Sequence, residues 1–541
     1  MPEEVVLMSK KSICLLDCTL RDGGYINDWN FGSSVISGIY KRLDKSGVDF
    51  IEVGFLDHRR EFDANRTIFP TTDALNKVYE RVQETNAIPV AMIDFGTCDI
   101  ENISDAKDSF VKGIRVIFKK EKIEQALPFC KQIKEKGYML FIQAISITAY
   151  SDEEMINYVS QINEISPYAF SIVDTYGLLD GEKMLHYFHL IDKHLDKNIA
   201  LGYHSHNNFQ LAFSNTMTFT DMFNGERTLI ADSTVYGMGK SAGNCATELL
   251  AMYMNSRYGK NYDLNKILEI VDTYLMTIYM NQYWGYKYNF YIAAMQNCHP
   301  SYVQYLLDKK TLSVKAVNKL LSDIPEEKKL LYDEKYIIDA YTDYQINSID
   351  DSESYSELKS LADREILLVG PGASIVTEKE AILEHINKHN PLVVSINFYA
   401  EDYKPDYIFI SNSKRYSQIS DSADSYPENT KIIATSNIET VNMPVDYCLN
   451  YDSLLLNGFK GCDNALILFL NALIKMGVKS VSLAGFDGYS LYGNNYYSTE
   501  HSYSFEIKSK LEANKNMSIV LNHLSDKIDV RFITETFYEK E

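Results

Sequence analysis

The stretch ICLLDCTLRDGGY, residues 13–25, joins a short apolar run to a charged, glycine-containing turn. ICLLD predicts a β-strand, and Arg21 and Asp22 follow shortly after its end. Charged side chains next to a buried strand cost desolvation free energy unless a partner or a ligand uses them. The stretch therefore predicts a strand whose carboxyl end carries a functional site.

Eight apolar runs repeat this pattern along the first half of the chain. They occupy residues 13–17, 49–55, 88–94, 113–118, 138–145, 168–174, 199–204 and 227–233. A segment long enough for a helix follows each run, which is the element order of a (β/α)8 (TIM) barrel. Active sites of such barrels lie at the carboxyl ends of the strands. The polar residues at these ends are Asp17, Glu52, Asp94, Gln143, Asp174, His204 and Asp232.

His204 and His206 lie two residues apart in GYHSHNNFQLA, residues 202–212. In an extended segment, residues i and i+2 point to the same side, so both imidazoles can reach one ion. A pair of histidines that caps the next helix is the competing interpretation. Asp22 adds a carboxylate, and Asn244 in YGMGKSAGNCATELL, residues 236–250, adds an amide oxygen. This ligand set favours a divalent metal ion that acts as a Lewis acid.

The motifs TLRDGG (19–24), HSHNN (204–208) and GMGKSAGNCATE (237–248) resemble those of the DRE-TIM metallolyases. The resemblance covers about residues 10–310 and is closest to the aldolase branch, which includes 4-hydroxy-2-oxovalerate aldolase. It implies that Asp22, His204, His206 and Asn244 bind Mg²⁺ or Mn²⁺ and that Arg21 faces the keto oxygen of a 2-oxo acid. It further implies a carbon–carbon lyase with a pyruvate-type enolate, an aldehyde or sugar-type carbonyl partner, and a homo-oligomer.

Tyr25 departs from the family pattern. The aldolase branch commonly has a histidine at this position as general base, whereas a tyrosine with a pKa of about 10 is a poor base at neutral pH. Tyr25 then acts as an acid, packs, or becomes a base through a nearby charge; His58 and His299 are alternative bases. Arg21, Asp22 and Tyr25 form the predicted catalytic set.

The loop after the second strand carries Arg59, Arg60 and Arg66. These arginines either bind a carboxylate or phosphate on the substrate or balance charge on a surface loop. The predicted substrate-binding residues are Glu52, Arg59, Arg66 and Asp174.

The chain is too long for one hydrophobic core, so several domains are expected. The predicted parts are the barrel (10–257), a helical annex (258–345), an acidic, serine-rich linker (346–364) and a C-terminal α/β domain (365–541). In the last part, apolar runs alternate with helical stretches, which predicts a doubly wound, Rossmann-like sheet.

The segment GPGAS, residues 370–374, follows the first apolar run of the C-terminal domain. It is not the dinucleotide fingerprint, because Ile375 stands where GxGxxG requires a glycine. Together with SINF (395–398), ISNSKRY (410–416) and GFDGY (485–489), it resembles a Rossmann-like group that includes bacterial sialyltransferases and glycosyltransferase-like proteins. An inactive interaction domain is the alternative. The resemblance implies nucleotide or sugar-nucleotide contacts from Gly370, Gly372, Ser374, Asn397 and Asp487.

Composition restricts the function further. The formal net charge of −21 over 541 residues argues against a nucleic-acid binder. No CxxC pair occurs among the eight cysteines, and no run approaches the roughly 20 apolar residues of a membrane span. We therefore expect a cytoplasmic protein. The resemblance to the aldolase branch implies an enzyme, with surface-polysaccharide sugar synthesis as one context. The alternatives are a Claisen-type acyl-CoA lyase or synthase, and a sugar-nucleotide-binding protein whose barrel is only a scaffold.

Overall fold

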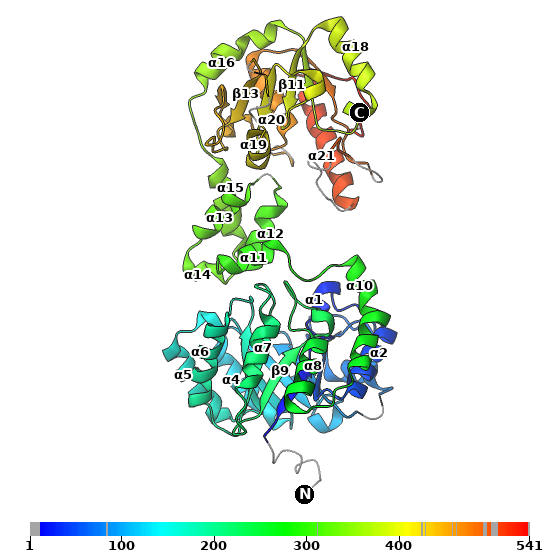
Figure 1. The fold of residues 1–541 in the computed structure, drawn as a ribbon, viewed down its shortest axis with the longest axis vertical. Coiled ribbons are helices and arrows are strands. Elements are labelled where there is room, and N and C mark those ends of the chain that lie inside the picture. The colour runs from blue at the N-terminus through cyan, green and yellow to red at the C-terminus, as the bar shows by residue number, and fades with distance from the viewer. Residues whose placement is uncertain are drawn as a thin grey trace. The chain divides into compact units, whose positions relative to one another are not determined.

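The structure of the chain is a computed structural model. It describes residues 11–82, 85–310, 312–422, 426–427, 429–456, 458–460, 463–490, 495–498 and 507–538. The chain divides into two compact units (Figure 1). Unit 1 runs to Val303 and also includes Pro325–Tyr332; unit 2 takes Gln304–Ile324 and the residues from Asp333 onward.

A closed barrel of eight parallel strands forms the centre of unit 1. The strands pair in the order β1-β9-β8-β7-β6-β5-β4-β2, and β1 pairs with β2 to close the ring. A two-residue strand, β3 (Ile68–Phe69), pairs with the end of β2. The barrel strands are β1 (Ile13–Asp17), β2 (Phe50–Leu56), β4 (Ile88–Asp94), β5 (Gly113–Phe118), β6 (Met139–Ala144), β7 (Ala169–Asp174), β8 (Ala200–Ser205) and β9 (Leu229–Ser233).

Helices cover the outer face of the barrel, so five of its strands, β1, β2, β7, β8 and β9, are buried at every position. This burial on both faces explains why the runs show no alternation of polar and apolar residues. In α2, Ile36, Ile39 and Leu43 are buried, and Gly47 ends the helix at φ +83°. The covering helices are α2 (Ser33–Ser46), α3 (Thr72–Tyr79), α4 (Ile123–Glu135), α5 (Asp152–Ile165), α6 (Gly181–His194), α7 (Ala212–Asp221) and α8 (Thr247–Tyr258).

The region after the barrel is helical, but it is divided between the two units instead of forming one annex. Helices α9 (Leu264–Ile270), α10 (Met276–Asn281) and α11 (Tyr288–Met295) belong to unit 1, and so does α14 (Glu326–Lys329). Helices α13 (Val314–Ser322) and α15 (Glu334–Gln345) belong to unit 2, and α12 (Pro300–Asp308) contains the boundary.

The segment expected as an acidic linker contains helix α16 (Ser352–Leu358). Leu358 and Leu361 are buried in the core of unit 2. The acidic and serine residues that suggested a linker therefore surround two leucines that anchor the segment to the sheet.

Unit 2 is built on a seven-stranded parallel sheet in the order β14-β13-β12-β11-β10-β15-β16. Its strands are β10 (Ile366–Val369), β11 (Leu392–Ile396), β12 (Tyr407–Ile410), β13 (Lys431–Thr435), β14 (Tyr447–Leu449), β15 (Ser480–Ala484) and β16 (Asp529–Phe532). The helices that alternate with them are α17 (Ser374–Thr377), α18 (Lys379–His389), α19 (Ser413–Ser420), α20 (Ala465–Met476) and α21 (Ile507–Leu524). The barrel and this second α/β sheet confirm the predicted fold class.

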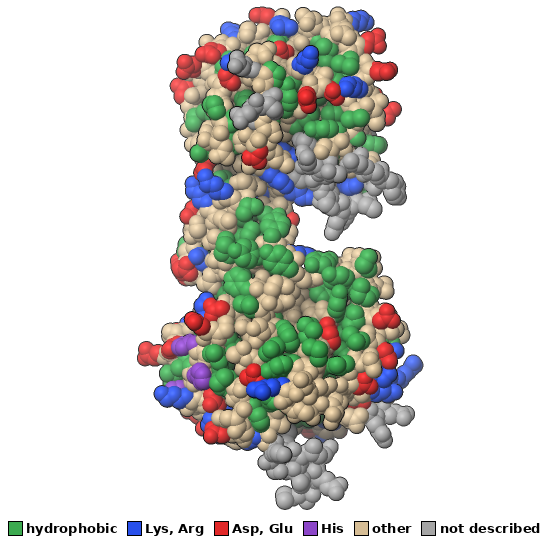
Figure 2. Space-filling model, in the orientation of Figure 1, with side chains coloured by type: hydrophobic (Ala, Val, Ile, Leu, Met, Phe, Trp, Pro, Cys, Tyr) green, Lys and Arg blue, Asp and Glu red, His purple; other side chains and the backbone are tan. Residues whose placement is uncertain are grey.

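The surface that Figure 2 shows carries interspersed acidic and basic side chains on both units. Among the described residues, no helix has the length and apolar character needed to cross a membrane.

Candidate active site

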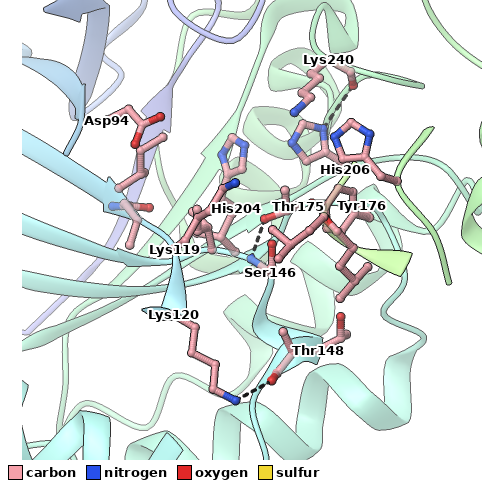
Figure 3. Close-up of a pocket in the computed structure, with 18 of the residues that line it drawn as sticks. Asp94, Lys119, Lys120, Ser146, Thr148, Thr175, Tyr176, His204, His206 and Lys240 are labelled. Carbon is pink, nitrogen blue, oxygen red and sulfur yellow. Dashed lines mark hydrogen bonds between the residues drawn. The ribbon is translucent and has the colours of Figure 1, made fainter. Parts of the chain in front are cut away.

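A cavity of about 580 Å³ lies at the carboxyl ends of the barrel strands. Its wall includes residues that follow β1, β4, β5, β6, β7, β8 and β9, as expected for a barrel active site. Arg21, Asp22, Tyr25, His204 and His206 all contribute to this wall. In Figure 3, His204, His206 and Lys240 gather at one end of the cavity, and Lys120 and Thr148 lie at the other. The structure thus brings together residues from widely separated parts of the chain.

Asp22, His204 and His206 form a buried cluster whose ligand atoms all lie within 4.8 Å of one another. Nδ1 of His204 donates to Asp232 at 2.9 Å, and Nδ1 of His206 donates to the Lys240 carbonyl at 3.2 Å. These bonds orient both rings, the usual way in which metal-binding histidines are held. Nε2 of His204 lies 3.2 Å from Oδ2 of Asp22 and 3.3 Å from the amide nitrogen of Asn244, so it points at the other two expected ligands. The cluster is therefore a candidate metal centre.

Asn244 supports this assignment through an unpaired oxygen. Its amide nitrogen donates to the Ser205 carbonyl at 3.1 Å, whereas its buried Oδ1 has no hydrogen-bond partner among the described residues. A Cβ on Gly239 would lie 1.7 Å from this Oδ1 and 2.9 Å from Oδ1 of Asp22, so both oxygens converge beside the glycine. Two carboxylate or amide oxygens and two imidazoles fit a divalent cation such as Mg²⁺ or Mn²⁺.

The electrostatics of the cluster favour a charged Asp22 and a neutral His206. Burial alone would raise the pKa of Asp22, but Arg21 at 2.5 Å and His204 at 3.2 Å outweigh it and hold that pKa well below its usual range. Burial lowers the pKa of His206 to about 3, although Asp22 opposes the shift. Asp22 and His206 are consequently in the protonation state that a cation requires. Burial lowers the pKa of His204, but hydrogen bonds to Asp22 and Asp232 outweigh it and raise that pKa, so a cation competes with a proton on this ring.

Glu52 lies behind Arg21 and does not line the cavity. Its Oε2 accepts from Nε of Arg21 at 2.6 Å, and its Oε1 lies 3.1 Å from Arg115. Arg115 also donates to Asp232, the partner of His204. Glu52 was expected to bind substrate; the structure instead places it in a buried ion-pair network that holds Arg21 and His204 in position.

The other three expected substrate contacts also lie outside the cavity wall. Arg59 pairs with Asp57 at 2.7 Å, and Arg66 pairs with Asp28. The Asp174 carboxylate accepts from the amides of Leu178 and Leu179, so it shapes the loop after β7. The alternative base His58 accepts from the Asp99 amide, also away from the cavity. Charged residues near the strand ends of this barrel therefore often form ion pairs or hydrogen bonds with neighbouring chain segments instead of lining the cavity.

Several cavity residues were not expected to contact a substrate, among them Lys119, Lys240 and Tyr176. They follow strands β5, β9 and β7. Residues that follow the strands of a barrel lie on its active-site face, so the strand pattern could have predicted that these residues lie near the cavity. Lys240 is not among the predicted site residues, although it lies between Gly239 and Asn244 in GMGKSAGN. Its Nζ lies 5.5 Å from the centre of the Tyr25 ring.

The segment Pro325–Tyr332 lines the cavity from outside the barrel sequence. The Tyr176 hydroxyl donates to the Leu330 carbonyl at 2.9 Å, and the His299 amide donates to the Lys329 carbonyl at 2.7 Å. The buried Tyr302 hydroxyl donates to the carbonyls of Lys328 and Leu331. These bonds fasten the segment, here called the covering segment, to unit 1.

His299 lines the same cavity. Burial, together with Lys240 and Lys119, lowers its pKa to about 4. Its Nδ1 accepts from the Ser301 amide at 3.2 Å, so the neutral ring carries its proton on Nε2. His299 is therefore suited to donate a hydrogen bond at neutral pH rather than to accept a proton there.

Tyr25 packs against Trp29 and Phe55, with ring centres at 4.8 and 6.2 Å. Partial burial raises the pKa of the phenol above its ordinary value, and Arg21 offsets only part of this rise. The phenol therefore stays protonated at neutral pH, which argues against Tyr25 as general base.

The variant Tyr25→Phe is expected to lower kcat by less than about tenfold, because it removes one neutral hydrogen bond and no proton acceptor. The pH–rate profile should keep the shape of the wild-type profile. Steady-state kinetics between pH 6 and 9 check both points, with Tyr253→Phe, half-buried and outside the cavity wall, as the control. Loss of one limb of the profile would instead identify Tyr25 as the titrating group.

Asp17 lies at the end of β1, where Thr247 and the Thr19 amide donate to it at 2.6 and 2.9 Å. Burial nevertheless raises its pKa from 3.8 to about 6. Because the folded-state pKa is the higher one, the Asp17 contribution to stability is present below pH 4 and is lost as the pH rises through 6.

The variant Asp17→Asn is expected to remove this pH dependence. The unfolding free energy of the wild type, minus that of the variant, should fall by about 3 kcal/mol between pH 4 and 7. Urea titrations at four pH values measure the difference, with the exposed Asp196→Asn as control. A difference that does not change with pH contradicts the assigned burial cost.

A parallel (β/α)8 barrel with a buried carboxylate and two histidines at its carboxyl-end cavity is a barrel with a candidate metal centre at the usual position of an active site. Residues 12–273, just under half of the chain, match the model of the HMGL-like family, and the relatives of this part include an aldolase and a synthase.

Relatives share this part at low identity. Oxaloacetate decarboxylase of Mycobacterium tuberculosis is 24% identical over 258 residues, which is 47% of this chain and 74% of that protein. 4-Hydroxy-2-oxovalerate aldolase of Bacillus cereus is 21% identical over 272 residues, 49% of this chain and 76% of that protein. (R)-Citramalate synthase of Methanocaldococcus jannaschii is 26% identical over 264 residues, 47% of this chain and 51% of that protein.

Among solved structures, the N-terminal domain of a Bacteroides vulgatus protein described as an aldolase matches with a TM-score of 0.46 and 24% identity. The match covers 57% of this chain and 99% of that domain.

The five residues expected to bind a nucleotide lie in unit 2. Gly372, Asn397 and Asp487 line a second cavity, whereas Gly370 and Ser374 do not. Gly370 directly follows β10, and Ser374 is the first residue of α17.

Proposed function

We propose that this protein is a divalent-metal-dependent aldolase or lyase that makes or breaks a carbon–carbon bond through the pyruvate-type enolate of a 2-oxo acid. The observation that carries the proposal is the convergence of Arg21, Asp22, His204 and His206 on one cavity. Cleavage next to a carbonyl leaves an enolate oxygen whose negative charge requires stabilisation.

The relatives support a 2-oxo acid as substrate. Oxaloacetate and 4-hydroxy-2-oxovalerate appear in the names of two of them, and carbon–carbon cleavage of either compound leaves a pyruvate enolate. A bound Mg²⁺ or Mn²⁺, held by Asp22, His204, His206 and Asn244, would supply Lewis-acid stabilisation of the developing charge.

Arg21 is placed to act on the same oxygen. Its Nε and Nη1 are occupied by Glu52 and Asp22, which leaves Nη2 as the nitrogen that can face the cavity. The two carboxylates fix the guanidinium, so little reorganisation is needed when charge develops. Tyr25 and His299 are the neutral donors that we assign to the oxygen of the carbonyl partner.

We further propose that the carbonyl partner is an aldehyde or a sugar-type compound, made or used in surface-polysaccharide sugar synthesis. The cavity of about 580 Å³ leaves room for a second substrate beside a three-carbon acid. Lys119, exposed at the end of β5, supplies a cation for an acidic group on that substrate.

The test is exchange of the C3 protons of pyruvate with deuterated buffer, followed by NMR. We expect exchange that needs Mg²⁺ or Mn²⁺, stops with a chelator and resumes when metal is restored. Protein that shows no exchange with either metal, and no turnover of 2-oxo acids, contradicts the proposal.

A Claisen-type reaction of an acyl thioester is the second candidate, favoured by the similarity to (R)-citramalate synthase. Deuterium exchange into acetyl-CoA instead of pyruvate would identify it. His204→Ala together with His206→Ala tests the scaffold alternative, because a barrel used only as a scaffold keeps its function without these rings.

A further inference from the structure

The sheet of unit 2 has a point at which its strand order reverses. The chain passes from β10 outward to β14 on one side and then returns to β15 and β16 on the other side of β10. In open parallel sheets, ligands bind in the crevice at the carboxyl ends of the strands at such a point.

A cavity of about 410 Å³ lies at this position, lined by residues that follow β10, β11, β12 and β15. Its size is within the range of about 300–1,000 Å³ that small-molecule sites occupy. The position and the size together identify a candidate binding site, separate in sequence from the barrel cavity.

The glycine-containing turn after β10 does not present a phosphate cradle. The Gly370 and Gly372 amides donate to the carbonyls of Ala484 and Gly485, both at 2.8 Å. The Ser374 amide and hydroxyl both donate to the Asp487 carboxylate. Asp487 therefore occupies the position that an anionic ligand would take, which corrects the expectation drawn from GPGAS.

The opposite wall offers the cations. Lys309, Lys310 and Arg415 line the cavity, and Arg415 is only 3% exposed. Asn397, at φ +63°, accepts from the Ser411 amide at 3.0 Å and so fixes the turn that leads to Arg415.

This wall also carries a helix start. Asn412 caps α19 by accepting from the Arg415 amide at 2.8 Å, so the first turn of that helix faces the same cavity as the cations. Cationic side chains and a helix N-terminus on one wall suit a phosphate group.

The remaining wall is polar and aromatic. Tyr489 and Tyr496 line it, with their hydroxyls 3.1 Å apart. Asp308, Asp463 and Asp487 also line the cavity and equal the three cations in number, so the cavity suits a ligand whose negative charge is confined to one end. Carboxylates accept from hydroxyl groups and tyrosine rings stack on planar rings, so this wall suits a sugar and a base.

We propose that the unit 2 cavity binds a nucleoside diphosphate, free or linked to a sugar, with its phosphates toward Lys309, Lys310 and Arg415. Its ribose and base lie toward the wall of Tyr489, Tyr496 and the carboxylates. The GPGAS turn shapes the site but does not hold the phosphates.

The test is isothermal titration of the full chain with UDP, ADP, UDP-glucose and inorganic phosphate. At least one nucleoside diphosphate should bind more tightly than phosphate alone. Lys309→Gln and Arg415→Ala should each weaken this binding by about tenfold or more, because each removes a charge-assisted contact to phosphate. Tighter binding of UDP-glucose than of UDP assigns the sugar-linked form, and the reverse order assigns the free form.

Three controls separate this site from other effects. Lys431→Ala, at the opposite end of strand β13, should leave binding within twofold. Asp22→Ala should also leave it unchanged, so failure of the barrel proposal is distinguishable from failure of this one. Lys309→Gln keeps the test valid if the buried Arg415 variant does not fold. Absence of nucleotide binding, or binding unchanged in Lys309→Gln and in a folded Arg415→Ala, overturns the proposal.

Discussion

Replacing Asp22 with alanine is expected to lower Mn²⁺ affinity by more than about 100-fold and to abolish turnover. Asp22 is the carboxylate of the buried cluster, and its pKa is held low. Loss of groups that merely orient metal ligands already costs about 10–100-fold in affinity or activity. Titration with Mn²⁺ and the pyruvate exchange assay measure the two losses.

Arg21→Ala is the informative comparison, because Arg21 contacts Asp22 but belongs to no metal cluster. It should retain Mn²⁺ affinity while kcat falls by about 100–1,000-fold, the usual loss for one oxyanion donor. Asp94→Asn, also in the cavity wall, should leave metal affinity unchanged. Equal loss of Mn²⁺ affinity in Asp22→Ala and Arg21→Ala would contradict the assigned roles.

Replacing Arg115 with alanine is expected to destabilise the protein by about 3–5 kcal/mol. Arg115 is 1% exposed and lies between the buried carboxylates of Glu52 and Asp232. Its removal leaves Glu52 with Arg21 alone and takes from Asp232 its guanidinium partner. The melting temperature should fall on the order of 10 °C, as calorimetry or circular dichroism would record.

Arg257→Ala provides the matched control, since Arg257 pairs with Asp221 on the exposed face of α8. A surface pair of this kind should contribute almost nothing to stability. If the Arg115 variant had the same melting temperature as the wild type, this would contradict the assigned cost of leaving the two buried carboxylates without Arg115.

Much of the barrel could be predicted from the sequence. The runs at 13–17, 88–94 and 113–118 match β1, β4 and β5 to the residue, because strands that are largely buried on both faces consist mainly of apolar residues. The Asp22, His204 and His206 cluster was also predictable, since a two-residue spacing and a strand-end carboxylate restrict the geometry.

The sequence does not show whether the other charged side chains near the strand ends point into the cavity or toward a neighbouring segment. Glu52, Asp174 and Arg59 occupy positions that in a barrel either face the cavity or hold a neighbouring segment. Only the three-dimensional partners, namely Arg21 and Arg115, the amides after Asp174, and Asp57, separate these outcomes. A similar limit applied to GPGAS, because the Asp487 that fills its turn lies more than 100 residues away in sequence.

The covering segment makes the barrel unit discontinuous along the chain. A polypeptide that ended after α8 would keep every predicted metal ligand and yet lose Leu330, Leu331 and Tyr332 from the cavity wall. A chimeric protein that received only the barrel, up to the last strand, would therefore carry the metal ligands but not the covering segment that completes the cavity wall. Since residues on both sides of the segment belong to unit 2, an insertion or deletion in those flanking residues would also change the chain connections of a segment that lines the barrel cavity.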